Sequence, residues 1–329
     1  MKLALLGTGK IVHQALLALL PVREIEKTAV FARPHSEETA RALAAEYGIK
    51  EVYTDYDELL EKTEADTVYV GLVNSAHYAY AKKALLSGKH VIMEKPFTST
   101  ASEAEEICAL ARERGRYVVE AVVCNYSSIM DKMREVLPFL GRIRMVQANY
   151  SQYSSRYGNY LKGIVEPCFD PALSGGALYD INIYNLNLII SLFGRPDEVR
   201  YFANIGFNGV DLSGTAVLSY PGFVATAAGA KDSDSPGFFT VQGEKGWIRM
   251  PDSPNAPRSL EICIGKEISL YKPEPFSHRM TEEFIRFARI FSEQDREAVQ
   301  SGMETSVTVL ETAERARRDA GIRFGVDSL

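Results

Sequence analysis

The sequence predicts two domains: an α/β domain with a parallel sheet, and an α+β domain with a large, open and predominantly antiparallel sheet. Over the first 120 residues, short apolar strands alternate with helical segments, as in βαβ units. After residue 125 come longer segments of alternating polarity, which are typical of antiparallel strands with one covered face. With 329 residues, the chain also exceeds the size of one hydrophobic core.

Composition excludes several classes of protein. The 46% hydrophobic and 24% charged residues are ordinary for a soluble globular chain. A net charge of −6 argues against nucleic acid as the main partner, because that affinity depends on basic patches. The apolar run at residues 15–20 is too short to span a membrane, and no signal-peptide cleavage site follows it. The cytoplasm is therefore the expected compartment, with no membrane partner.

The four cysteines predict neither disulfides nor a metal site. They are widely scattered, without a C-x-x-C spacing and without a histidine cluster. They are Cys108, Cys124, Cys168 and Cys263.

A glycine turn follows the first expected strand, residues 2–6, and precedes a helix at residues 11–20. Gly7 permits a tight turn, Gly9 lets a pyrophosphate approach the backbone, and the helix N-terminus supplies N–H donors. Val12 replaces the third glycine of this fingerprint, so helix and strand are expected to pack less closely. The residues predicted to hold a dinucleotide here are Gly7, Thr8, Gly9, Lys10 and Ile11.

The second strand, at residues 28–32, is followed by Arg33. A site for NAD usually places Asp or Glu at this strand end, to hold the ribose hydroxyls. Arginine suits the 2′-phosphate of NADP instead, so NADP is the predicted cofactor and NAD the alternative. A surface arginine without a ligand is the other interpretation.

The alternation continues with strands expected at residues 51–53, 67–72, 90–94 and 117–120, and with helices at residues 36–47, 74–87 and 98–114. Ser36 is expected to cap the first of these helices, and Thr98 or Ser99 the last. Asn74 and His77 open the middle one. The pattern is that of a dinucleotide-binding domain.

The strand at residues 90–94 runs into Glu94, Lys95 and Pro96. A strand buried on both faces can place a charge only where it emerges at its carboxyl edge, and ligands of open α/β sheets bind there. Pro96 ends the strand, because it has no N–H for the ladder. Lys95 is thus predicted at the rim of a cleft. The alternative is that Glu94 and Lys95 are solvated strand-end charges.

In the second half, strands are expected at residues 143–153, 198–204, 215–220, 223–228, 238–242 and 260–264, and a helix at residues 177–193. This helix is apolar around most of its circumference. Four of its polar residues, Asp180, Tyr184, Asn187 and Ser191, fall within a narrow stripe. Such a stripe indicates a water-lined cleft; a hydrogen-bonded core stripe or one facing an oligomer interface is the alternative.

These segments together resemble the Gfo/Idh/MocA oxidoreductases over nearly the whole chain. The matching motifs, in the family's order, are Gly7-Thr8-Gly9-Lys10-Ile11, Asn74 with His77, Glu94-Lys95-Pro96, Glu120-Ala121, and Gly175-Gly176-Ala177-Leu178-Tyr179-Asp180 with Tyr184. The resemblance implies that Lys95 lies beside the nicotinamide and the substrate hydroxyl, and that a cis bond precedes Pro96. Cofactor contacts are implied for Asn74, His77, Glu94, Lys95 and Pro96. For His77, near a helix start, a capping or surface histidine is the alternative.

The resemblance also implies catalytic roles for Lys95, Asp180 and Tyr184. Asp180 would bind the substrate or orient its neighbour. Tyr184 would transfer the proton, as in the dihydrodiol-dehydrogenase and glucose-fructose type of the family. The chemistry agrees: tyrosine, with an ordinary pKa near 10, is a poor base, and a nearby lysine ammonium favours the phenolate. The site is expected between the two domains.

Departures from the family pattern concern the substrate more than the fold. Val73 stands where the family usually has proline, and Asn182 where this type usually has glycine. Asn182 is therefore expected to alter the shape of the pocket. The segment of residues 153–169, rich in Tyr, Ser and Gly, is expected to line it.

The resulting hypothesis is an NAD(P)-dependent oxidoreductase that transfers a hydride between nicotinamide and a hydroxyl or keto carbon of a sugar, polyol or vicinal diol. The alternative is a non-catalytic dinucleotide- or sugar-sensing regulator on the same fold. Residues 1–121 are expected to bind the dinucleotide. Residues 122–329 are expected to bind the substrate and form a homodimer or homotetramer through the open sheet, with a last helix at about residues 303–320 packing back on the first domain.

Overall fold

The structure is a computed structural model that describes residues 1–328. The chain forms two compact units, each described by itself below. The first comprises residues 1–121 and 276–306, and the second comprises residues 122–275 together with the chain from residue 307. The chain therefore passes between the units after residues 121, 275 and 306.

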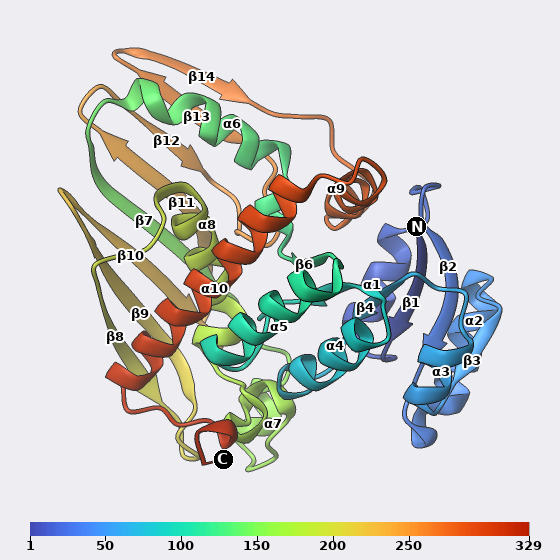
Figure 1. Cartoon of the computed structure of the whole chain (residues 1–329). Coiled ribbons are helices and arrows are strands. Elements are labelled where there is room, and N and C mark those ends of the chain that lie inside the picture. Colours follow the sequence, from blue (N-terminus) through green and yellow to red (C-terminus); the bar gives the residue numbers. More distant parts are fainter. Residues whose placement is uncertain (329) are drawn as a thin grey trace. The chain divides into compact units, whose positions relative to one another are not determined.

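The first unit is built on a six-stranded parallel sheet. Its strands are β1 Lys2–Leu6, β2 Glu26–Phe31, β3 Glu51–Tyr53, β4 Thr67–Val70, β5 His90–Glu94 and β6 Val118–Ala121. They lie in the order β3-β2-β1-β4-β5-β6, coloured blue to green-cyan in Figure 1. The strand order reverses between β1 and β4, and ligands of such sheets bind outside the carboxyl ends of the strands at this point.

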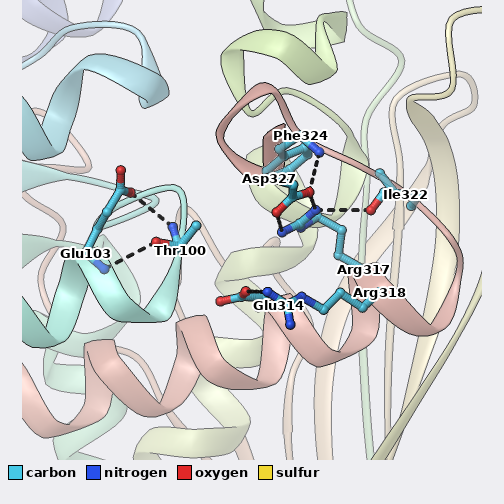
Figure 2. Close-up of polar contacts among 8 residues, drawn as sticks. All are labelled: Thr100, Glu103, Glu314, Arg317, Arg318, Ile322, Phe324 and Asp327. Atoms are coloured by element: carbon cyan, nitrogen blue, oxygen red, sulfur yellow. Dashed lines mark hydrogen bonds and ion pairs between the residues drawn. The ribbon is translucent and has the colours of Figure 1, made fainter. Parts of the chain in front are cut away.

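Helices connect these strands. They are α1 Lys10–Ala18, α2 Glu37–Tyr47, α3 Tyr56–Lys62, α4 His77–Leu86 and α5 Ala101–Arg114. Ser36 stands at the N-cap of α2 as expected, but its side chain makes no capping hydrogen bond. The cap of α5 was wrongly predicted: it is Thr100, which forms a reciprocal capping box with Glu103 (Figure 2).

Residues 276–306 complete the first unit because their side chains pack into it. Helix α9, Thr281–Ser292, places the Phe284 ring 5.9 Å from the ring of Tyr69 on β4. The Thr281 hydroxyl donates to the carbonyl of Ala18 at the end of α1 (3.0 Å). The last helix is longer than expected: α10 covers Arg296–Asp319, and its residues up to 306 count with the first unit.

The second unit is built on an eight-stranded sheet. Its strands are β7 Ile143–Ser151, β8 Glu198–Ile205, β9 Asp211–Tyr220, β10 Phe223–Ala230, β11 Ser235–Gly243, β12 Gly246–Met250, β13 Leu260–Ile264 and β14 Glu267–Tyr271. They lie in the order β14-β13-β12-β11-β7-β10-β9-β8 (Figure 1), and only the β7–β10 pair is parallel. The predicted, predominantly antiparallel sheet is confirmed; β12 and β14 were not anticipated.

One face of this sheet is covered and the other is open. On β7 and β10, Val146 and Ala225 are buried, whereas their neighbours Met145 and Val224 are 43% and 44% exposed. This alternation is the one expected for a sheet with a single packed face. Helices α6 Ser128–Val136 and α8 Ile183–Phe193 belong to this unit, together with the short helix α7 Tyr157–Tyr160.

Residues 322–327 are fixed to α10 within the second unit (Figure 2). The buried guanidinium of Arg317 pairs with both carboxylate oxygens of Asp327 and donates to the carbonyl of Ile322 (3.1 Å). Asp327 in turn accepts the N–H of Phe324, whose ring packs edge-on against Tyr179 at 4.7 Å.

Across residues 1–328, none of the helices has both the length and the apolar character needed to cross a membrane. The four cysteines are free thiols. Within the same residues, no three His, Cys, Asp or Glu side chains gather in a way that could hold a metal ion.

Candidate active site

The turns after β1 and β4 meet at the point where the strand order reverses. Gly7 has a φ of +108°, and a Cβ atom added to it would lie 2.7 Å from the carbonyl oxygen of Gly71. Backbone conformation and space therefore both require glycine at residue 7. The N–H of Gly7 bonds the carbonyl of Phe31 on β2, which fixes the start of the turn.

At residue 9, neither the backbone conformation nor the surrounding space requires glycine. Gly9 occupies the N-cap of α1 with a φ of −78°, makes no side-chain cap, and has no described atom within 4 Å of an added Cβ. A side chain here would still cover the N-terminus of α1, where the first N–H groups have no intrahelical partner. Glycine at this position suits a pyrophosphate bound to those N–H groups, so the turn fits a dinucleotide.

Val12 compensates for the missing third glycine of the turn. Its side chain is fully buried, and its Cγ2 atom would lie 2.7 Å from a Cβ atom at Gly71. The small residue that allows close packing is therefore Gly71, after β4, instead of residue 12 on α1. The expectation of looser packing did not take Gly71 into account.

Arg33 directly follows the buried Ala32 after β2. It is exposed, and its guanidinium forms no ion pair with any of residues 1–328. Pro34 then begins a short 3-10 turn that leads into α2. An accessible guanidinium without a protein counter-ion at this strand end is suited to a phosphate.

Glu94 is buried at the end of β5, so the interpretation of solvated strand-end charges is wrong for this residue. Its carboxylate accepts the hydroxyl of Tyr69 (2.6 Å) and the N–H of Lys95 (3.3 Å). Burial raises the pKa of Glu94. Lys95 itself is partly exposed, and its bond to Pro96 is cis, as the resemblance implied.

His77 fastens the end of β5 to the end of β4. Its ring is buried, with Nδ1 2.9 Å from the carbonyl oxygen of Pro96 and Nε2 3.1 Å from that of Leu72. Burial lowers the pKa of His77, and a neutral ring has one N–H to donate. The imidazole thus fixes the backbone of Pro96, the residue that follows Lys95. Asn74, in the 3-10 turn just before α4, is partly exposed.

Two further buried carboxyls lie in the first unit, and the sequence did not single them out as acids of a site. Glu120 on β6 accepts the Ser306 hydroxyl (2.6 Å), and burial raises the pKa of Glu120 to about 7. The two carboxyl oxygens of Glu283 on α9 have no hydrogen-bond partner among the described residues. Burial, reinforced by Glu94, raises the pKa of Glu283 well above its ordinary range.

In the second unit, two glycines begin the helical segment that carries Asp180 and Tyr184. A Cβ atom on Gly175 would lie 2.6 Å from the carbonyl oxygen of Pro167. Gly176 has a φ of +123°, and its Cβ would lie 2.1 Å from a carboxylate oxygen of Asp211. The same carboxylate accepts the N–H of Leu178 (2.6 Å), which anchors the first turn of the segment.

The first turn is a π-helix, Leu178–Asn182, and α8 follows it. Single π-helical turns often occur at functional sites, because the wider turn displaces side chains from the regular α-helical positions. Tyr184 is buried, and its ring packs edge-on against Tyr150 with centroids 5.8 Å apart. Asp180 stays partly exposed and forms an ion pair with Lys231 (2.7 Å).

Lys231 was missed by the sequence reasoning, although a signal was present. It directly follows β10 and is 1% exposed. Like Lys95, Lys231 is a charge at the end of an apolar strand. The polarity of its neighbours Asp232, Ser233 and Asp234 obscured it.

The rest of the polar stripe is a hydrogen-bonded core, which was the alternative interpretation. The Asn125 amide donates to Asn187 (2.9 Å) and accepts the Ser191 hydroxyl (3.0 Å). Asn182 is fully buried and donates to the carbonyl of Ala227 (2.8 Å), so it faces the sheet of its own unit. Glycine at residue 229 makes room for it, because a Cβ there would lie 2.9 Å from that of Asn182.

Each half of the candidate site is thus organised within its own unit. Lys95 and the dinucleotide turn belong to the first unit, whereas Asp180 and Tyr184 belong to the second.

Comparison with known proteins identifies the family. The Gfo/Idh/MocA model described as "Oxidoreductase family, NAD-binding Rossmann fold" matches residues 1–121, and the Gfo/Idh/MocA C-terminal domain model matches residues 132–249. The NADP(+)-dependent scyllo-inositol 2-dehydrogenase IolU of Bacillus subtilis is 32% identical over 330 residues, with 99% of both chains covered. The trans-1,2-dihydrobenzene-1,2-diol dehydrogenase of Bos taurus is 28% identical over 333 residues, covering 95% of this chain and 94% of the other.

Solved structures agree on the fold. Aldose-aldose oxidoreductase from Caulobacter crescentus superposes with a TM-score of 0.84 at 22% identity, covering 98% of this chain and 97% of the other. A 3-ketoreductase from Actinomadura kijaniata, in complex with NADP and TDP-benzene, reaches a TM-score of 0.82 at 23% identity, with 98% of both chains covered. The chain therefore belongs to the Gfo/Idh/MocA family and is an NAD(P)-dependent oxidoreductase that acts on CH–OH groups.

Proposed function

We propose that the protein is an NADP-dependent dehydrogenase of a polyol, a sugar or a related vicinal diol. The observation that carries this proposal is the exposed Arg33 after β2, a counter-ion for the 2′-phosphate, in a chain 32% identical over its length to an NADP(+)-dependent scyllo-inositol dehydrogenase. The dihydrodiol dehydrogenases among the relatives extend the substrate class to vicinal diols.

The first unit would hold the cofactor. The N-terminus of α1, bared by Gly9, would bind the pyrophosphate, and Arg33 the 2′-phosphate. Asn74 and Lys95, the partly exposed residues at the ends of β4 and β5, would face the nicotinamide. When bound, the nicotinamide supplies the chemistry of hydride transfer.

The residues of this chain would move the proton. In the oxidative direction the hydroxyl of the substrate gives its proton to the phenolate of Tyr184. The ammonium of Lys95 would stabilise the negative charge that develops on the substrate oxygen. Asp180 would accept a hydrogen bond from a neighbouring hydroxyl of the substrate, because its side chain is partly exposed while its carboxylate is paired with Lys231.

The open face of the eight-stranded sheet would form a homodimer or homotetramer. Met145 and Val224 are paired in register on β7 and β10, and both side chains are exposed on this face. Phe202 on β8 is 70% exposed. Apolar side chains arranged in this way on one broad face are typical of a contact between copies.

The test is a titration of the purified protein with NADPH and NADH, followed by an assay with NADP⁺ and scyllo-inositol, other polyols, aldoses and a vicinal diol. Tighter binding of NADPH and turnover of a compound from this set are expected. Tighter binding of NADH would contradict the cofactor assignment alone. Failure of every polyol, aldose and diol with either cofactor would contradict the substrate class.

A further inference from the structure

Lys231 is a buried ammonium with a complete set of partners in the second unit. Its Nζ atom lies 2.7 Å from a carboxylate oxygen of Asp180 and 2.5 Å from the carbonyl oxygen of Cys168. It also lies 4.3 Å from the centroid of the Phe169 ring. An ammonium has three N–H donors and no acceptor, and these neighbours are all electron-rich. The position of the ammonium is therefore tightly defined.

The backbone of Lys231 is engaged as well. Its N–H donates to the carbonyl of Leu212 on β9, and its carbonyl accepts the N–H of Ser154 (both 2.8 Å). Ser154 lies near the start of the segment of residues 153–169, and Cys168 and Phe169 lie at its end. One residue thus holds both ends of this segment and the carboxylate of Asp180.

The end of the 153–169 segment is also tied to the turn before the helix. The carbonyl of Cys168, on which the Lys231 ammonium rests, also accepts the N–H of Gly176 (3.1 Å). Gly175 is free of a side chain that would collide with Pro167. Lys231, the segment end and the helical start that carries Asp180 therefore pack as a single body.

The two residues of this ion pair depend on each other to different degrees. A fully buried ammonium without a counter-charge is strongly unfavourable, so Lys231 needs the Asp180 carboxylate. Asp180 is 34% exposed and could be solvated on its own, so it does not need Lys231 to remain charged. What Asp180 gains from the pair is a fixed orientation, together with a lower tendency to take up a proton.

We propose that Lys231 is a positioning residue for the reaction: it holds the ionised carboxylate of Asp180 in place and couples its orientation to the 153–169 segment. This inference rests on the proposed function, since it assigns Lys231 a role in that reaction through Asp180. Lys231 is not proposed to touch the substrate.

The kinetic test compares Lys231→Met with Lys231→Arg, using NADP⁺ and scyllo-inositol. The methionine variant should lose about 10²-fold in kcat/KM, the scale expected for a misplaced binding group, while its Kd for NADPH stays within about twofold. The arginine variant, which retains the charge, should recover part of the loss. Lys266→Met, which removes an exposed lysine between β13 and β14, is the control and should match the wild type.

A pH profile separates positioning from general damage to the fold. The acid limb of kcat/KM that disappears in Asp180→Asn should move to higher pH in Lys231→Met, because the ammonium no longer favours the carboxylate. Arg156 acts electrostatically on Asp180 and Asp211 on Lys231, and Arg156 is itself paired with Glu166. All three residues are unchanged in the variant. An unshifted limb, or kcat/KM equal to that of the wild type, would overturn the proposal.

A double-mutant cycle of Asp180 and Lys231, measured by thermal unfolding, needs no substrate. Asp180→Asn leaves the buried ammonium without its counter-charge and should lower Tm by roughly 5 °C or more. Adding Lys231→Met to Asp180→Asn should restore most of this loss. Simply additive losses would overturn the proposed pairing. If the wild type turned over no polyol, aldose or diol, the proposed function would fail and this cycle would still decide the pairing.

Discussion

Val12 and Gly71 pack as a complementary pair, in which the valine fills the space that a side chain on the facing strand end would need. The Cγ2 atom of Val12 would lie 2.7 Å from a Cβ atom at Gly71. A chain with two glycines in its first turn thus retains close packing at the point where its strand order reverses.

Exchanging the sizes of this pair tests that relationship. Gly71→Ala should lower the free energy of unfolding by about 1–3 kcal/mol through overpacking, and Val12→Ala by a similar amount through the cavity it leaves. In the double variant the two changes should compensate in part, since the alanine at residue 12 removes the colliding Cγ2. Urea unfolding measures all three. Fully additive losses would show that the two side chains do not share this space.

Arg33→Ala should weaken binding of NADPH while leaving that of NADH nearly unchanged. A charge-assisted contact to the 2′-phosphate is worth about 1.5–3 kcal/mol, so the Kd for NADPH should rise by roughly 10–100-fold. Fluorescence titration with both cofactors gives the comparison. Arg41→Ala is the control, because Arg41 is on α2 and paired with Glu37. An equal rise in the Kd values for NADPH and NADH would show that Arg33 does not bind the 2′-phosphate.

Tyr184→Phe should remove the tyrosine's contribution to proton transfer without disturbing binding of the cofactor. We expect kcat to fall by about 10²–10⁴-fold and the Kd for NADPH to stay near the wild-type value. Tyr220→Phe serves as the control, because Tyr220 is another buried tyrosine of the same unit and its hydroxyl bonds the carbonyl of Gly194. Wild-type turnover in the Tyr184 variant would exclude this tyrosine from the mechanism.

Glu120→Gln should change the pH dependence of stability. Burial raises the pKa of Glu120 from an ordinary value near 4.5 to about 7 in the folded protein. The stabilisation from the protonated carboxyl is therefore complete below about pH 4.5 and is lost as the pH rises through 7. At 1.36 kcal/mol per pKa unit this amounts to about 3 kcal/mol. Glutamine has no such loss and can still accept the Ser306 hydroxyl.

The measurement is urea unfolding of both proteins between pH 5 and pH 8. The free energy of unfolding of the variant, minus that of the wild type, should increase with pH across this range. A constant difference would mean that Glu120 does not titrate there.

Val224→Asp should disrupt the proposed oligomer. A carboxylate in the middle of the open sheet face would be desolvated by a second copy. Light scattering at micromolar concentration should give a multiple of the 36.5 kDa chain mass for the wild type and a lower mass for the variant. Leu86→Asp, at a similarly exposed apolar position on α4, should keep the wild-type mass. A monomeric wild type would end the proposal.

The fold could be predicted from the sequence because its strands are apolar runs or strict alternations. β1, β3, β5 and β13 begin and end at the expected residues. β14 was missed because most of its residues are exposed, which leaves no burial pattern to detect. The cap of α5 was misplaced because Thr98, Ser99 and Thr100 are all competent caps, and only the Glu103 partner decides among them.

The candidate site was predictable in residue type but not in arrangement. Glu94 is recognisable at a strand end, yet its burial depends on Tyr69 from a neighbouring strand. The ion pair of Asp180 with Lys231 joins residues about 50 positions apart, and the first turn of the helical segment is anchored by Asp211, which lies on another element. Local periodicity contains no information about such pairs.

Because the chain crosses from one unit to the other three times, the order in which the protein can fold during synthesis is restricted. All eight strands of the second unit, which end at Tyr271, leave the ribosome before α9 does. The first unit begins the chain, but it lacks the Phe284 ring beside Tyr69 and the Ser306 hydroxyl on Glu120 until residue 306 has been made. The unit that is started first is therefore completed late, and a fragment cut after residue 121 would expose the surface that α9 covers.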